Sequence, residues 1–161
     1  IHGGGHEMGL RSGTLNVFGV AGLALAFKVM IENQKKDIAK LKEYTELFIE
    51  NLKKSDIEFY INGPTQNRLP GNLNFCLKGV DADWLTSMLP DIAMARGSAC
   101  TSETIQPSHV LRAIGLNDED ANSSLRASFG RFTTENDINY ATEKIIENVQ
   151  KYLSKKKSLA I

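Results

Sequence analysis

The chain has 161 residues, of which 42% are hydrophobic, and its 19 basic and 19 acidic residues cancel. This length and composition predict one globular core, and the balanced charge gives no general reason to expect nucleic-acid binding. No signal-peptide pattern opens the chain, and we expect no apolar stretch long enough to span a bilayer. The two cysteines lack the spacing of a disulfide framework or a zinc site, which fits a reducing, cytoplasmic compartment.

The first residues predict a loop followed by a long helix. Three consecutive glycines disfavour regular structure, so residues 3–13 should form a loop. From about Leu15, apolar residues repeat at helical spacing so densely that this helix should be buried nearly all round. The period continues through residues 38–52, where lysines and glutamates leave one apolar stripe and one solvated face.

Short strands and helices follow in mixed order. We expect strands at 57–61, 73–77, 92–95 and 125–129, and helices at 82–89 and 108–114. A last helix should begin after Thr134, which forms a capping box with Asp137. Because helices and strands do not alternate strictly, the chain predicts an α+β fold, a small, mostly antiparallel sheet with helices packed on it.

Two cysteines differ in their surroundings. Cys100 stands among the small and polar residues 97–102, where no sequence neighbour would bury the thiol. A reactive cysteine must be reachable and electrostatically helped, and Arg96 is the nearest candidate helper. Composition alone would favour an inert surface cysteine, but the motifs that follow favour a reactive one. Cys76 alternates with apolar residues in a strand and is expected to pack on one sheet face.

Four blocks of the sequence resemble one enzyme family. They are Arg96–Ser102, Pro107–Leu116, Ser123–Thr133 and, near the N-terminus, Gly3–Thr14. Together they resemble cysteine desulfurases of the class V aminotransferase family, the NifS/IscS-like group with a long cysteine-bearing loop. The resemblance covers residues 3–146 and implies the C-terminal part of such an enzyme.

The resemblance also implies a domain organisation. Residues 1–14 would be a glycine-rich loop that ends the large-domain region. Residues 15–153 would form the small C-terminal domain of a fold-type I pyridoxal-phosphate enzyme, with the catalytic cysteine loop at about 96–106. Residues 154–161 would be a basic tail.

The family implies a reaction and its residues. Cysteine desulfurases use pyridoxal 5'-phosphate to remove sulfur from L-cysteine, which gives L-alanine and a persulfide on an enzyme cysteine for iron-sulfur cluster assembly or tRNA thiolation. Cys100 matches that nucleophile, Arg126 matches the arginine that binds the substrate carboxylate, and Thr14 matches a threonine that reaches the cofactor phosphate of the neighbouring subunit. The implied partners are a second copy of the chain and an iron-sulfur scaffold or other sulfur-acceptor protein.

The sequence departs from the family at several points. No lysine has the setting of the family's cofactor-binding lysine, which lies upstream in the large domain. Met8 stands where many relatives carry a basic residue, and Arg96 where they often carry a small one. Since Ile1 is not a methionine, we expect the chain to begin within a longer protein. Because the cofactor lysine is missing, we expect the chain to be catalytically inactive alone.

Other interpretations remain open. One is a split desulfurase whose lysine-bearing half is a separate polypeptide. Another is a non-enzymatic persulfide carrier, which the missing lysine favours and the substrate arginine disfavours. A third is a dimerisation or scaffold-docking module without chemistry.

We expect no metal site. His2 and His6 are four residues apart beside Glu7, but metal ligation at that spacing needs a helix face, which the intervening glycines deny. His109 is expected to be a packed or surface residue rather than a base.

Overall fold

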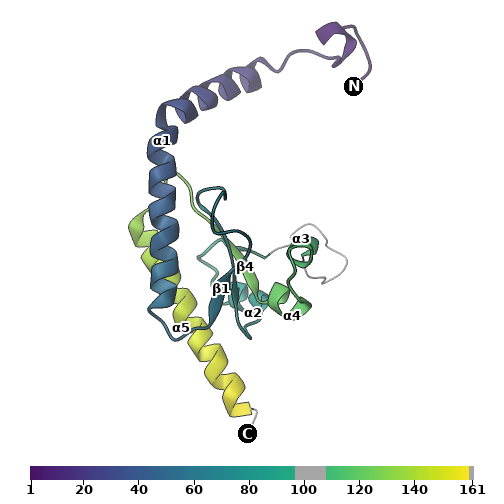
Figure 1. Cartoon of the computed structure of the whole chain (residues 1–161). Coiled ribbons are helices and arrows are strands. Elements are labelled where there is room, and N and C mark those ends of the chain that lie inside the picture. The colour runs from purple at the N-terminus through teal and green to yellow at the C-terminus, as the bar shows by residue number, and fades with distance from the viewer. Residues whose placement is uncertain (97–107, 160–161) are drawn as a thin grey trace. The chain divides into compact units, whose positions relative to one another are not determined.

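The computed structural model describes residues 1–96 and 108–159. The chain divides into two compact units, Ile1–Lys36 and Asp37–Ile161. The long helix α1 (Val17–Lys53) runs through the division, so its two parts belong to different units (Figure 1). The domain boundary that the family resemblance suggests after residue 14 stays a prediction.

Unit 1 begins with a loop that contains one short 3-10 turn, η1 (Glu7–Gly9), in the region predicted as a loop. Helix α1 starts at Val17, two residues later than predicted. Its first turn is capped by the Asn16 side chain, whose Oδ1 accepts a hydrogen bond from the Gly19 backbone N–H at 2.9 Å. Asparagine is a favoured residue at this position because its side chain satisfies an otherwise unpaired backbone donor.

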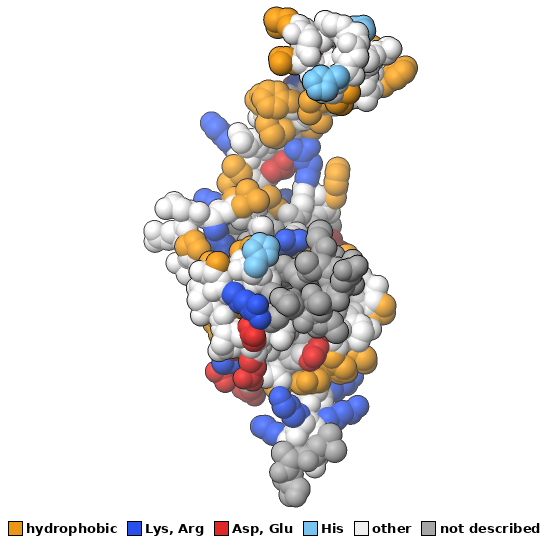
Figure 2. Space-filling view, turned by 90° about the vertical axis from the view of Figure 1, so that its right-hand side faces the viewer, with side chains coloured by type: hydrophobic (Ala, Val, Ile, Leu, Met, Phe, Trp, Pro, Cys, Tyr) orange, Lys and Arg blue, Asp and Glu red, His pale blue; other side chains and the backbone are white. Residues whose placement is uncertain are grey.

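The N-terminal part of α1 is exposed, and the prediction that it would be buried nearly all round was wrong. Phe18 is 91% exposed and Leu23 is 73% exposed. Figure 2 shows apolar side chains at the surface over this part of the helix. No other helix or strand of unit 1 is long enough to cover them, because only η1 precedes α1.

The same stretch corrects a second expectation. An 18-residue window of α1 has a mean hydropathy of 1.2 and none of it is buried, so its length and composition suffice to cross a membrane. The expectation that no stretch is long and apolar enough was therefore wrong. Buried helices of water-soluble proteins have the same composition, so this property alone does not assign a membrane span.

Unit 2 is built on a four-stranded sheet with the strand order β1-β2-β4-β3. The strands are β1 (Phe59–Ile61), β2 (Asn72–Leu77), β3 (Ala95–Arg96) and β4 (Ser124–Ser128). The helices are α2 (Ala82–Ser87), α3 (His109–Ala113), α4 (Asp118–Asn122) and α5 (Glu135–Leu159), together with the second part of α1. Each of the three strand pairs is antiparallel, which confirms the predicted α+β class.

One face of the sheet carries the hydrophobic core. The C-terminal part of α1 and α5 lie on this side, and α3 and α4 lie on the other (Figure 1). Phe48 of α1 packs edge-on against Phe75 of β2, with ring centroids 5.3 Å apart. The fully buried side chains around them come from β2, β4 and α5 and include Leu73, Leu77, Leu125, Ile138, Ile145 and Val149.

Two local features fix the ends of the sheet and the start of α5. The Gly71 backbone has a φ of +74°, and a Cβ at this position would lie 2.8 Å from the Phe129 carbonyl oxygen. Only glycine fits both the left-handed conformation and this close approach. The predicted capping box is present, since the Thr134 N–H donates to Asp137 Oδ2 at 2.8 Å and the Asp137 N–H donates to Thr134 Oγ1 at 3.2 Å.

Two elements differ from the sequence prediction by more than two residues at an end. Strand β3 begins at Ala95, three residues later than predicted, because the Ile92 N–H is engaged in a turn with the Leu89 carbonyl. Helix α4 was not predicted. Its signal was Asn117, whose side chain accepts from the Asp120 N–H, followed by three acidic residues that favour a helix N-terminus.

Candidate functional site

The second face of the sheet is polar. Successive residues of a strand point to opposite faces, so the residues that alternate with the core residues share this face. They pair directly across β2 and β4, as Asn72 with Ser128, Asn74 with Arg126 and Cys76 with Ser124. Their opposition places amide, hydroxyl and guanidinium groups side by side on one surface.

Arg126 lies near the middle of this face. Its Cα partners are Asn74 on β2 and Ala95 on β3, and its side chain is exposed. The chain has six arginines. Four of them pair with a carboxylate, namely Arg11, Arg96, Arg112 and Arg131, and Arg68 donates to the Asn72 carbonyl. The Arg126 side chain alone has no ion pair or hydrogen bond to a residue that the structure describes. An arginine in this state presents a planar, permanently charged fork that suits a carboxylate.

Among the described residues, Arg126 lies on an open sheet face and does not line an enclosed cavity. It could therefore bind one charged group of a ligand without surrounding the ligand. A cavity of about 300 Å³ near the C-terminal end of β4 is lined by Ser128, Phe129 and Tyr140, but not by Arg126. The hydroxyl of Tyr140 donates to Asp91 at the rim of this cavity. That hydrogen bond holds the pKa of Asp91 below its usual value and raises the pKa of Tyr140.

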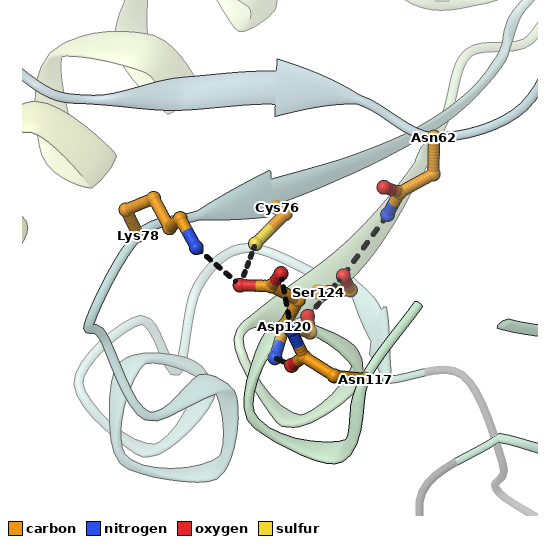
Figure 3. A network of polar contacts seen from close by, with 6 residues as sticks. All are labelled: Asn62, Cys76, Lys78, Asn117, Asp120 and Ser124. Atoms are coloured by element: carbon orange, nitrogen blue, oxygen red, sulfur yellow. Dashed lines mark hydrogen bonds and ion pairs between the residues drawn. The ribbon is translucent and has the colours of Figure 1, made fainter. Parts of the chain in front are cut away.

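A polar network joins α4 to the sheet on the same side (Figure 3). Asp120 of α4 accepts a hydrogen bond from Lys78 Nζ at 2.8 Å. Ser124 Oγ donates to the Asp120 backbone carbonyl at 2.6 Å and accepts from Asn62 Nδ2 at 2.9 Å. The Lys78 ammonium lowers the pKa of the Asp120 carboxyl, and Asp120 in turn raises the pKa of Lys78. The network therefore holds a charged pair against the sheet.

Cys76 is part of this network. Its side chain is fully buried, as predicted, and its Sγ lies 4.0 Å from Asp120 Oδ1. Burial raises the pKa of the Cys76 thiol. Because the nucleophilic form of cysteine is the thiolate, this residue is inert in the folded chain.

Arg96 ends β3 and is the last described residue before the segment 97–107. Its Nη1 donates to Asp83 of α2, and its Nη2 donates to Asn122 of α4 at 3.0 Å. The sequence suggested Arg96 as an electrostatic helper for Cys100, and the structure shows its guanidinium bound to these two residues. Cys100 itself lies outside the described residues.

Thr14 lies in unit 1, and Arg126 in unit 2. Thr14 is exposed and lies between the turn η1 and the start of α1, which Asn16 caps. Its backbone carbonyl accepts a 3.4 Å hydrogen bond from Arg11, so the side-chain hydroxyl is the group that Thr14 can offer to a ligand.

The α+β fold and the polar sheet face belong to a known class of protein. Residues 4–140 match the aminotransferase class-V family, and the chain belongs to that family.

The chain is similar to cysteine desulfurases within this class. It is 46% identical over 152 residues to the cysteine desulfurase IscS of Pseudomonas putida, an alignment that covers 94% of this chain and 37% of that protein. The structure of a NifS-like protein from Rickettsia africae superposes with a TM-score of 0.80 at 30% identity, over 94% of this chain and 39% of that one. A structure described as SspA in complex with cysteine superposes with a TM-score of 0.58 at 26% identity, over 83% of this chain and 36% of that one. The resemblance inferred from the sequence motifs is thus confirmed, and the chain spans little more than a third of the length of these relatives.

Proposed function

We propose that this chain is the C-terminal part of a pyridoxal-phosphate-dependent cysteine desulfurase and that it supplies the substrate anchor and the sulfur-accepting cysteine. The observation that carries the proposal is Arg126, an exposed guanidinium on a polar sheet face without a partner among the described residues. The relatives named cysteine desulfurase support the class of reaction.

Arg126 would bind the carboxylate of L-cysteine. A guanidinium and a carboxylate form two parallel hydrogen bonds, which fix the orientation of the substrate as well as its position. Ala95 on the neighbouring strand is small and Asn74 is uncharged, so neither side chain competes as an ion-pair partner. The strands on both sides of β4 restrain the Arg126 backbone, which favours a preorganised anchor.

Cys100 would accept the sulfur. Its thiolate attacks the sulfur atom of the bound cysteine, a sulfur-sulfur bond forms, and the carbon-sulfur bond of the substrate breaks. The electron pair of the broken bond stays with the substrate carbon skeleton, which takes up a proton and leaves as L-alanine. One thiol and one cysteine thus become one persulfide and one alanine, with no external oxidant or reductant.

Pyridoxal phosphate, when bound, supplies an electron-withdrawing ring that stabilises negative charge on the substrate carbons. Among the described residues, Arg126 suits the carboxylate of a substrate attached to this group, and the Thr14 hydroxyl suits the phosphate of the group held by the neighbouring subunit. Lysine attachment fits poorly here. Lys78 and Lys144 are bound to carboxylates that raise their pKa, whereas a nucleophilic lysine needs a lowered one. We propose that the attachment lysine lies upstream of this chain, as the resemblance to the family implies.

The remaining parts of the proposal concern the whole protein. It would act as a homodimer in the cytoplasm, with Thr14 reaching the cofactor phosphate of the neighbouring subunit. A scaffold or another acceptor protein would then take the sulfur from Cys100. The main alternative is a non-enzymatic persulfide carrier, which would need Cys100 but not Arg126.

The test is alanine formation from L-cysteine by the full-length protein loaded with pyridoxal phosphate. Cys100→Ala should abolish alanine formation and leave the spectral change on cysteine binding intact, because the thiol acts after binding. Arg126→Ala should weaken cysteine binding by about 10-fold to 100-fold, since a charged hydrogen bond contributes about 1.5–3 kcal/mol. Arg126→Lys keeps the charge without the fork and should fall between. Unchanged cysteine affinity in Arg126→Ala would refute the anchor, and persulfide on Cys100 without alanine formation would favour the carrier.

A further inference from the structure

Three residues form a row across the polar face of the sheet. Asn74 of β2 is the Cα partner of Arg126 of β4. On the other side of Asn74 lies Asn62, which directly follows β1 and whose backbone N–H donates to the Asn74 carbonyl at 2.9 Å. Asn74 therefore stands between Asn62 and Arg126 in this row.

The pair of Asn74 and Arg126 is of the closely spaced kind. The Phe129 N–H donates to the Gly71 carbonyl at 2.7 Å, which marks a hydrogen-bonded position between β2 and β4. Hydrogen-bonded and non-hydrogen-bonded positions alternate along an antiparallel pair. Asn74 is three residues from Gly71, so its pair with Arg126 is a non-hydrogen-bonded one. Cα atoms are about 4.5 Å apart at such positions, and the two side chains are close enough to contact one small ligand.

A chain of hydrogen bonds fixes which atom of the Asn74 amide is engaged. It begins at the backbone carbonyl of Asp120, which can only accept, so the Ser124 hydroxyl donates to it at 2.6 Å. With its single proton used, Ser124 Oγ accepts from Asn62 Nδ2 at 2.9 Å (Figure 3). The second N–H of Asn62 donates at 2.6 Å to Asn74, whose contacting atom must therefore be the acceptor Oδ1.

The amide of Asn62 keeps this orientation at a cost. Only 5% of Asn62 is exposed, and its Oδ1 is buried without a hydrogen-bond partner among the described residues. Turning the amide over would face Oδ1 toward the oxygens of Ser124 and Asn74 and would lose both hydrogen bonds. The direction of the chain thus follows from the Asp120 carbonyl and extends to Asn74.

Asn74 keeps an unused donor group beside an unused guanidinium. Its Nδ2 carries two N–H donors and makes no hydrogen bond to a described residue, and the same holds for the Arg126 side chain. Two groups that only donate cannot bind each other, whereas one anion with two acceptor oxygens can bind both. The pair is therefore complementary to a carboxylate.

We propose that Asn74 is a second ligand of the substrate carboxylate beside Arg126, and that Asn62 is a positioning residue that keeps the Asn74 Nδ2 group available. That the carboxylate is that of L-cysteine rests on the proposed desulfurase function, whereas carboxylate binding by the pair does not. Without Asn62, the Asn74 amide can turn its Oδ1 toward Arg126. The two residues would then bind each other in place of the ligand.

Carboxylate binding is tested in the 161-residue chain with sodium acetate as the probe and sodium chloride at the same ionic strength as the reference. The side-chain amide signals of Asn74 in NMR spectra should shift with acetate and not with chloride. Arg126→Ala should remove this response, and Asn62→Ala should reduce it. Equal shifts with both salts, or no shift of the Asn74 signals, would overturn the proposal.

Asn51 provides a matched control. Its Nδ2 also donates to an asparagine Oδ1 and to a hydroxyl, those of Asn139 at 2.8 Å and Thr142 at 3.1 Å, in a network between α1 and α5. Its amide signals should not respond to acetate, and Asn51→Ala should leave cysteine binding unchanged. A response of Asn51 equal to that of Asn74 would mean that acetate acts nonspecifically, which would also overturn the proposal.

The role in cysteine binding is tested by spectral titration of the full-length protein loaded with pyridoxal phosphate. Asn74→Ala should weaken L-cysteine binding about 10-fold, because a hydrogen bond to a charged group is lost. Asn74→Asp should weaken it at least as much as Arg126→Ala does, since the new carboxylate binds Arg126 itself. Asn62→Ala should weaken it by a smaller factor and should add no loss to that of Asn74→Ala.

Cysteamine, which is cysteine without its carboxyl group, separates carboxylate binding from a structural effect. Its affinity should be unchanged in Asn74→Ala and in Asn62→Ala. Equal losses for cysteine and cysteamine, or an unchanged cysteine affinity in Asn74→Ala, would refute the role in cysteine binding. If the wild-type protein forms no alanine, the proposed function fails, and the acetate measurement still decides whether Asn74 and Arg126 bind a carboxylate.

Discussion

The two parts of helix α1 share an apolar helical pattern but differ in environment. In residues 17–36 the pattern is dense and the large side chains are exposed, with Phe18 at 91%. In residues 37–53 the apolar stripe is narrower, yet the side chains of Phe48 and Leu52 are at most 1% exposed. Burial therefore depends on a facing surface as well as on hydrophobicity. The second part has β2, β4 and α5 to pack against, and the first has no such element in unit 1.

The largest effect that this comparison predicts is on the free energy of unfolding of the 161-residue chain. Phe48→Ala should destabilise unit 2 by about 3–5 kcal/mol, because it removes a ring packed against Phe75 and Phe129 and leaves a cavity. Phe18→Ala should change it by less than about 0.5 kcal/mol, since that ring is exposed. Urea denaturation followed by circular dichroism measures both. Equal losses would show that the N-terminal part of α1 has a packing surface in solution.

The same pair of substitutions in the full-length protein sharpens the comparison. The family match extends over the whole of α1, and the chain spans 37% of its Pseudomonas putida relative. We expect Phe18→Ala to destabilise the full-length protein by about 3 kcal/mol, as for a buried core ring. This result would identify the stretch as a core helix of the enzyme. Insertion of the helix into lipid vesicles, with no loss of stability in Phe18→Ala, would instead identify it as a membrane segment.

A pair of glycines gives the next largest contrast. Gly71→Ala should destabilise unit 2 by about 1–3 kcal/mol, because its backbone has a φ of +74° and its Cβ would meet the Phe129 carbonyl. Gly22 lies inside α1, where an added Cβ meets nothing within 4 Å. Gly22→Ala should therefore stabilise the helix by about 0.5–1 kcal/mol. Thermal unfolding of the two variants against the unmodified chain measures the difference, and a stabilised Gly71→Ala would contradict the close approach to Phe129.

The sequence predicted those parts of the fold that depend on local pattern. Four strands, the start of α5 and the antiparallel α+β class followed from alternation, turn residues and the capping box at Thr134. Helix α4 was not predicted because its five residues include a single apolar side chain, Ala121. Its only sequence signal is the N-cap residue Asn117. The burial of α1 was wrong because periodicity reports which residues are apolar and does not report what faces them.

In the candidate site too, the sequence predicted residues but could not predict their contacts. Motifs led to the prediction of Arg126, Cys100 and Thr14 as site residues. No pattern of hydrophobicity could show that the Arg126 side chain alone of the six arginines lacks a partner among the described residues. The contacts of Arg96 with Asp83 and Asn122 were equally out of reach, because they join residues 13 and 26 positions apart in the sequence. Their only signal was an arginine at a position where the family resemblance implies a small residue.

The smallest predicted effect distinguishes the ion pairs of the two units by their response to acid. Lys78 lowers the pKa of Asp120 in the folded chain, whereas an unfolded aspartate titrates at about pH 3.9. A carboxyl with a depressed folded pKa stabilises the fold above its unfolded pKa, and this contribution is lost as the pH falls through the folded pKa. Asp120→Asn should thus destabilise unit 2 at pH 7, by less than Gly71→Ala does, and the difference from the unmodified chain should shrink below about pH 4.

Lys78→Met should show the same loss of stability at pH 7 and no further loss when combined with Asp120→Asn. Glu7→Gln removes the exposed pair with Arg11 in unit 1 and should leave the stability of unit 2 unchanged at every pH. Urea titrations between pH 2.5 and pH 7, a range that includes the titration of aspartates, measure the four variants and the unmodified chain. A difference for Asp120→Asn that persists at the lowest pH would exclude its charge as the cause.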